Sequence, residues 1–122
     1  MSALAWVLAA PAGALGALAR FGTGRVMARR FGLHAPWGVL AVNLIGTFLL
    51  GLLVGINPGD GLVLILGAGF LGSYTTFSTW MAETDGLAEQ GRWNAALLNL
   101  VGPAAGGLII GAAGFALGMA LA

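Results

Sequence analysis

Residues 67–80 read Gly-Ala-Gly-Phe-Leu-Gly-Ser-Tyr-Thr-Thr-Phe-Ser-Thr-Trp, a glycine-rich apolar approach followed by a run of hydroxyl side chains. Glycines followed by β-branched threonines favour a helix that breaks here. An unbroken helix is the alternative, because serine and threonine can bond back to carbonyls of their own helix. Within a bilayer, broken backbone is tolerated only where protein buries it or where it lines a wet cavity. A break here would therefore be a candidate functional site.

The composition around this stretch is that of a membrane protein. The chain has 122 residues, of which 59% are hydrophobic and 7% are charged. Soluble domains have about 25% charged residues, and a short soluble chain needs them to cover its large surface. The chain is long enough for one domain. We therefore expect a single integral membrane domain in the cell membrane.

Four apolar stretches approach the about 20 residues that a helix needs to cross the hydrocarbon layer. We expect membrane-spanning helices at residues 3–26, 36–56, 61–82 and 93–121, with the third broken near 72–76. The fold class is thus all-α with four transmembrane helices. Nothing before Arg20 is charged, so a cleaved secretory signal is not expected.

Glycines recur at a spacing that places them on one face of a helix. In lipid, such small faces let two helix backbones approach closely. The spacing indicates tight packing within a subunit or between subunits. The pairs are Gly51/Gly55, Gly102/Gly106, Gly107/Gly111 and Gly114/Gly118.

The arginines give an orientation. With four spans, the connections at 20–36 and 82–94 lie on one side of the membrane and hold Arg20, Arg25, Arg29, Arg30 and Arg92. The other side holds only Asp60 and the two termini. Arginine-rich loops stay cytoplasmic, so both termini are expected outside.

Several function classes are disfavoured. The chain has no cysteine and one histidine, His34, so neither a thiolate site nor a histidine cluster can form. A net charge of +1 gives no basis for nucleic-acid binding. No nucleophile–base pair is available, so no enzyme is expected. All four carboxylates are expected in connections or at segment ends, which argues against small multidrug-type antiporters, the alternative, because these need a buried carboxylate.

Uncharged polar residues remain within the expected spans. Asn43 and Thr47 are four residues apart on the second helix and so share a face, and Asn99 lies on the fourth. A lone asparagine within a membrane span more often forms a hydrogen bond to a neighbouring helix than binds an ion. Asn43 and Thr47 together with the break in the third helix predict an ion path. A non-transporting assembly subunit with glycine packing faces is a further alternative.

At these residues the chain resembles the Fluc (CrcB) family of fluoride channels. The resemblance runs through three helices in order and covers nearly the whole sequence. Its motifs are Gly16-Ala17-Leu18-Ala19-Arg20-Phe21, Val42-Asn43-Leu44-Ile45-Gly46-Thr47-Phe48 and Gly69-Phe70-Leu71-Gly72-Ser73-Tyr74-Thr75-Thr76-Phe77-Ser78-Thr79. The third motif, ending in Thr-Thr-Phe-Ser-Thr, is the most specific.

The resemblance implies an antiparallel dimer with two narrow pores that passively export cytoplasmic fluoride and so relieve its toxicity. Asn43 would be the pore asparagine, and Phe77 the first pore phenylalanine. Ser78 and Thr79 would supply hydroxyls along the anion path. Amides, hydroxyls and positive ring edges suit an anion that must exchange its water for donors.

The resemblance also implies a structural sodium ion at the dimer centre. Backbone carbonyls of Gly72 and Thr75, two from each subunit, would bind it. Arg20 would place a fixed positive charge near a vestibule.

The chain departs from the family pattern at the end of the third helix and on the fourth. Trp80 stands where the family has a second pore phenylalanine. Asn99 and Pro103 stand where it usually has a tyrosine and a serine. Asn99 could still donate to an anion, but proline has no N–H. With the one-sided arginines, this favours pairing with a related chain of opposite orientation over pairing with itself.

Overall fold

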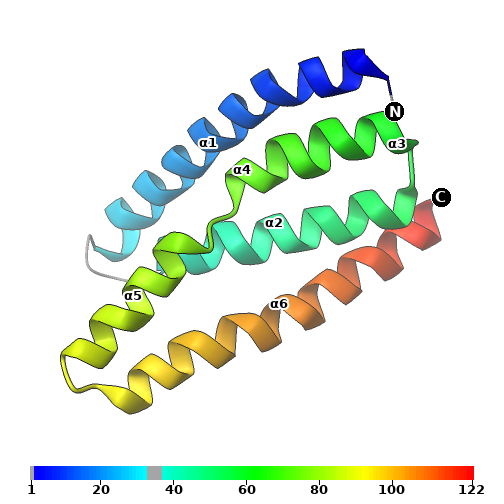
Figure 1. Cartoon of the computed structure of the whole chain (residues 1–122). Coiled ribbons are helices and arrows are strands. Elements are labelled where there is room, and N and C mark those ends of the chain that lie inside the picture. The colour runs from blue at the N-terminus through cyan, green and yellow to red at the C-terminus, as the bar shows by residue number, and fades with distance from the viewer. Residues whose placement is uncertain (1, 33–36) are drawn as a thin grey trace.

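The computed structural model describes residues 2–32 and 37–122, and its regular structure over those residues is entirely helical (Figure 1). The elements are α1 (Ala3–Phe31), α2 (Trp37–Ile56), α3 (Asp60–Leu62), η1 (Val63–Leu71), α4 (Gly72–Tyr74), α5 (Ser78–Glu89) and α6 (Trp93–Leu121). The expected start of the second span at Pro36, and His34, lie outside the described residues. Both termini lie at the same end of the bundle, opposite the α5–α6 turn.

Four helical stretches are long and apolar enough to cross a membrane, which confirms the four-span fold class. They are Ala3–Phe31, Trp37–Ile56, Asp60–Glu89 and Trp93–Leu121. The first helix continues beyond the expected end at residue 26. Arg29 and Arg30 occupy its last turn, where the helix dipole favours positive charge. It ends at Gly32, whose φ of 95° favours glycine, and whose N–H donates to the Ala28 carbonyl at 2.9 Å.

The third span is interrupted, but later than expected. Gly72–Tyr74 is helical, so the break that was expected near 72–76 begins only at Thr75. The Thr75 N–H still donates to the Leu71 carbonyl at 3.0 Å, and Thr75 itself is extended, with ψ of 161°. The chain then steps sideways and resumes as α5 at Ser78 (Figure 1). The interruption is therefore residues 75–77.

Glycines bring α2 and α6 into backbone contact. A methyl group at Gly51 would collide with the Gly111 carbonyl, and one at Gly114 with the Phe48 carbonyl. Gly118 meets the Leu52 carbonyl in the same way. Two of the expected glycine pairs, 51/55 and 114/118, thus pack within the subunit. A methyl at Gly107 would meet no other described residue within 4 Å.

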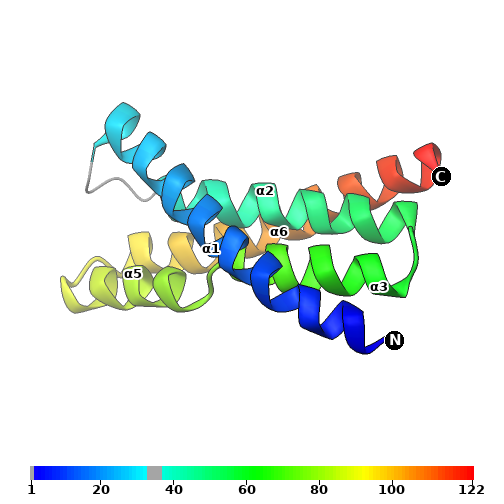
Figure 2. The ribbon, with the colours of Figure 1, turned by 90° about the horizontal axis from the view of Figure 1, so that it is seen from above.

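Helix α1 crosses the third span obliquely (Figure 2). At the crossing, Gly16 lies against the backbone of Phe70, where no side chain would fit. The Tyr74 hydroxyl, 3.0 Å from Thr23 Oγ1, ties α4 to α1 on the same side. A small buried cluster of Val42, Leu71 and Tyr74 lies beside this contact.

Much of the apolar surface is exposed. Leu108 is 79% exposed and Phe77 is 69% exposed, and many other leucine, valine and tryptophan side chains are similarly open. Lipid or a partner helix has to cover such a surface, because exposing this much apolar area to water is unfavourable. The subunit is thus built for a bilayer.

Candidate functional site

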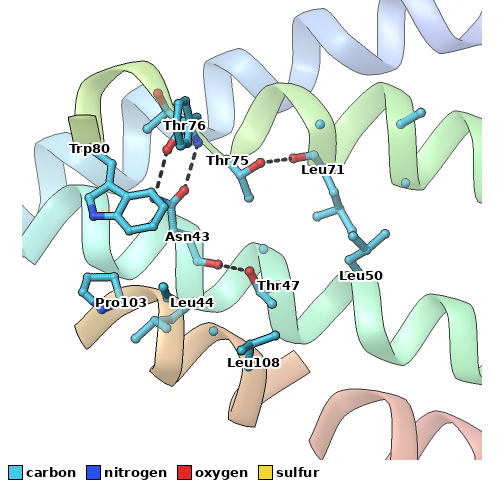
Figure 3. Close-up of a pocket in the computed structure, with 17 residues that line it drawn as sticks. Asn43, Leu44, Thr47, Leu50, Leu71, Thr75, Thr76, Trp80, Pro103 and Leu108 are labelled. Carbon is cyan, nitrogen blue, oxygen red and sulfur yellow. Dashed lines mark hydrogen bonds between the residues drawn. The ribbon is translucent and has the colours of Figure 1, made fainter. Parts of the chain in front are cut away.

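Asn43 on α2 reaches across to the interruption and pairs with the backbone of Thr76. Its Nδ2 donates to the Thr76 carbonyl at 2.9 Å, and the Thr76 N–H donates to Asn43 Oδ1 at 2.9 Å (Figure 3). Thr76 is only 8% exposed. A side-chain amide thus supplies both partners that a broken helix denies to one residue at membrane depth.

The Thr76 hydroxyl organises the start of α5. Its Oγ1 accepts from the Thr79 N–H at 3.3 Å and donates to Thr79 Oγ1 at 3.3 Å. The Ser78 hydroxyl lies 3.5 Å from the same oxygen. The first amides of a helix have no partner within it, and Thr76 satisfies one of them. Thr76 belongs to the Thr-Thr-Phe-Ser-Thr motif, but the sequence did not single it out as the centre of the cluster.

The interruption also removes the helical donors from two carbonyls. In an unbroken helix the Thr76 N–H would donate to Gly72 and the Thr79 N–H to Thr75. Here these two amides donate to Asn43 Oδ1 and Thr76 Oγ1 instead. The Gly72 and Thr75 carbonyls are the two that the family resemblance assigns to sodium. Hard cations prefer oxygen ligands, so carbonyls without an internal donor are the right chemical type for the ion.

A cavity of about 760 Å³ lies between α2, the interruption and α6 (Figure 3). Most of its wall is apolar. It brings together four of the residues that the sequence placed on the anion path: Asn43, Thr47, Phe77 and Trp80. The Thr47 hydroxyl donates to the Asn43 carbonyl of its own helix at 2.6 Å.

A second cavity, of about 250 Å³, lies on the α1 side of the interruption. It contains Arg20 and Thr79, together with Glu83 of α5. Thr76 lines both cavities. Glu83 was expected at the end of a span, but α5 continues to Glu89, which places the carboxylate within the helix. The sequence did not single out Glu83, because the third span was expected to end at residue 82.

The two aromatic residues meet edge to face. The Phe77 and Trp80 ring centroids are 5.8 Å apart with an interplanar angle of 89°. Phe77 lines the main cavity and its ring is largely exposed in the single subunit, whereas the Trp80 indole N–H donates to the Asn99 carbonyl on α6 at 2.6 Å. Positive ring edges of this kind can face an anion.

Asn99 is not brought to the main cavity. Its Nδ2 donates to Thr84 Oγ1 at 2.9 Å. Asn99 lines a third cavity, of about 880 Å³, between α2, α5 and α6, together with Glu83 and Arg92. Ser78 lines none of these three cavities and stays near Thr76.

Comparisons with known proteins agree on one group. Residues 7–115 match the family described as "CrcB-like protein, Camphor Resistance (CrcB)". The protein "Fluoride-specific ion channel FluC 1" of Symbiobacterium thermophilum is 43% identical over 121 residues, covering 94% of this chain and 98% of the relative. FluC 1 of Rubrobacter xylanophilus is 49% identical over 112 residues, covering 91% and 89%. FluC 2 of Mycobacterium tuberculosis is 43% identical over 96 residues, covering 79% and 76%.

Proposed function

This chain belongs to the CrcB (FluC) family of multi-pass membrane proteins, and we propose that it is a subunit of a fluoride-specific channel that lets cytoplasmic fluoride leave the cell. The family is one of channels, and the chain is not an enzyme. The observation that carries the proposal is the interruption at Thr75–Phe77, held by Asn43 beside a cavity. Irregular backbone at membrane depth is tolerated where protein buries it or where it lines a water-filled cavity. Here the interruption is paired with Asn43 and also lines a cavity.

The groups around the interruption suit a small, strongly hydrated anion. The Asn43 NH₂ uses one hydrogen on Thr76 and has a second to donate. The hydroxyls of Ser78 and Thr79 and the ring edges of Phe77 and Trp80 are further partial positive charges. Conduction requires binding that is weak enough to release the ion, and partial charges meet this need.

A passive path is sufficient for export. A membrane potential, negative inside, drives one elementary charge with about 2.3 kcal/mol per 100 mV. Arg20 in the second cavity places a fixed positive charge beside the path and raises the local anion concentration. Glu83 in the same cavity offsets part of that charge.

The proposal includes an antiparallel dimer with a central sodium ion. Phe77, 69% exposed in the single subunit, is half of an ion path whose other half a partner has to supply. The Gly72 and Thr75 carbonyls of each subunit would hold the sodium, which offsets the repulsion between facing carbonyl dipoles. All five arginines occupy one side of the sequence-derived topology, so the favoured partner is a related chain of opposite orientation.

Fluoride efflux from liposomes that contain the purified chain tests the function. We expect efflux that F77I abolishes, because isoleucine has no positive ring edge. F31I is the matched control: Phe31 is 54% exposed at the end of α1 and lines none of the three cavities described above. It should leave efflux unchanged.

The same assay separates the alternatives. Efflux from the chain alone identifies the homodimer as a working form. Efflux that appears only when a related chain of opposite orientation is co-reconstituted supports the heterodimer. Efflux that stops when the pH gradient is dissipated would instead indicate an antiporter. A dimer that forms but conducts no fluoride in either setting would indicate an assembly subunit and overturn the channel proposal.

A further inference from the structure

Pro103 leaves one carbonyl of α6 without its helical donor. In an α-helix the amide of residue 103 would donate to the carbonyl of Asn99, but proline has no N–H. The proline ring also crowds that carbonyl and tilts it away from the helix axis. A carbonyl left unpaired in this way, at membrane depth, needs a partner from a neighbouring helix.

Trp80 is that partner. Its indole Nε1 donates to the Asn99 carbonyl at 2.6 Å, from α5 to α6. The indole N–H is the only hydrogen-bonding group of a tryptophan side chain. The bond therefore fixes the ring and leaves it no N–H for an anion.

Two further hydrogen bonds link Asn99 back to Trp80 through Thr84. Asn99 Nδ2 donates to Thr84 Oγ1 at 2.9 Å, and Thr84 Oγ1 donates to the Trp80 carbonyl at 3.0 Å. We call Trp80, Thr84, Asn99 and Pro103 the α5–α6 latch. Within it, the Trp80 indole N–H and one Asn99 side-chain N–H are used on protein atoms rather than directed into the ion path.

We propose that Pro103 and Trp80 act as a coupled pair. The Asn99 carbonyl that Pro103 frees accepts the hydrogen bond from the Trp80 indole. This bond makes Trp80, on α5, the positioning residue for the side of the ion path that α6 forms. Both residues line the main cavity (Figure 3). The fixed indole in turn sets the 5.8 Å edge-to-face contact with Phe77. This inference rests on the proposed function, because its consequence is measured as fluoride flux.

Two of the three departures from the family pattern thus compensate each other. A phenylalanine at position 80 would leave the Asn99 carbonyl unpaired, whereas an alanine at 103 would restore its helical donor. If Trp80 were only a space-filling side chain, the effect of W80F would not depend on residue 103. The coupling between the two positions is the distinguishing quantity.

A double-mutant cycle measures it, with W80F, P103A and W80F/P103A in whichever dimer conducts fluoride. We expect W80F to slow efflux about tenfold more in the Pro103 background than in the P103A background, within the usual range of coupling between contacting residues. P11A is the matched control, because Pro11 is the helix-internal proline of α1. It should not rescue W80F.

The outcomes are distinct. An equal effect of W80F in both backgrounds overturns the proposal, and so does coupling seen in the melting temperature but not in efflux, because a purely structural contact would give that. If W80F folds only with P103A, that result alone shows a structural contact, and the efflux of P103A decides as in the next case. If neither W80F protein folds, P103A alone decides: released Trp80 should change efflux, and unchanged efflux overturns the proposal. Absent efflux in the parent dimer would count against the proposed function, while the melting temperatures would still report the pairing.

Discussion

The Asn43 side chain and the Thr76 backbone are joined by two hydrogen bonds of 2.9 Å that run in opposite directions. One amide side chain thereby replaces a turn of helix and keeps the third span open at residues 75–77. The pairing explains how the break survives in lipid, where an unpaired N–H or carbonyl is strongly unfavourable. It also makes Asn43 a structural residue in addition to its proposed role on the anion path.

Replacing Asn43 with alanine should cost both stability and transport. The substitution removes both partners of Thr76. The Thr76 carbonyl is left unpaired even where the Thr76 N–H closes on the Gly72 carbonyl, and a buried unpaired group costs about 1–3 kcal/mol. We expect a lower melting temperature in detergent and loss of fluoride efflux. N43D is the intermediate case: its carboxylate can accept from the Thr76 N–H but cannot donate to the Thr76 carbonyl when ionised. We call the two hydrogen bonds between Asn43 and Thr76 the Asn43–Thr76 clamp, and a fully active N43A would contradict its role.

Thr47 gives the matched comparison on the same face of α2. Its hydroxyl donates to the Asn43 carbonyl within α2, so T47V removes a local bond and keeps the side-chain shape. Stability should change by less than about 1 kcal/mol. Fluoride efflux near the parent rate would assign Thr47 a structural role. A large loss of efflux at unchanged melting temperature would assign its hydroxyl to the anion path.

Thr76 separates the effect of a hydroxyl from that of the backbone clamp. T76V keeps the Asn43 pairing but removes the oxygen that accepts from the Thr79 N–H, whereas T76S keeps that oxygen. Loss of such a cap costs about 1 kcal/mol. We therefore expect a lower melting temperature for T76V and a value near the parent for T76S. Equal melting temperatures for the two variants would argue against the cap.

The sequence predicted the four spans and the approximate place of the break, because apolar length and the residues at 67–80 are local signals. It did not predict where within that stretch the helix ends. That boundary depends on Asn43, which lies 33 residues away along the chain and captures the Thr76 amide. A non-local bond of this kind leaves no pattern in the neighbouring residues.

The expected anion path was only partly assembled, for a related reason. Asn43, Thr47, Phe77 and Trp80 share a cavity, but Asn99 turns to Thr84. Composition indicates that a residue is polar and within a span, but the neighbouring helix decides which way it points. Glu83 was missed because charged residues mark span ends on average, whereas here α5 continues past it to Glu89.

The glycine contact between α2 and α6 predicts a large effect from a single methyl group. G114A would force that methyl into the Phe48 carbonyl, and overpacking of this kind costs about 1–3 kcal/mol. G107A lies on the same helix with open space around it, so the gain in helix propensity should leave it as stable as the parent or more so. Thermal unfolding in detergent, followed by size-exclusion chromatography, compares the two. Equal destabilisation by both would show that the contact is not tight.

The proposed sodium site predicts that the melting temperature of the dimer depends on sodium, and that N43A loses this dependence. At constant ionic strength, replacing N-methylglucamine with sodium should raise the melting temperature of the dimer, because an ion that binds only the folded state stabilises it by mass action. In N43A the Thr76 N–H is released and can close the helix on the Gly72 carbonyl, which takes away one of the two proposed ligands. The sodium-dependent rise should then shrink or vanish in N43A and persist in T47V. A rise of the same size in all three proteins would show that the ion acts elsewhere than at Gly72 and Thr75.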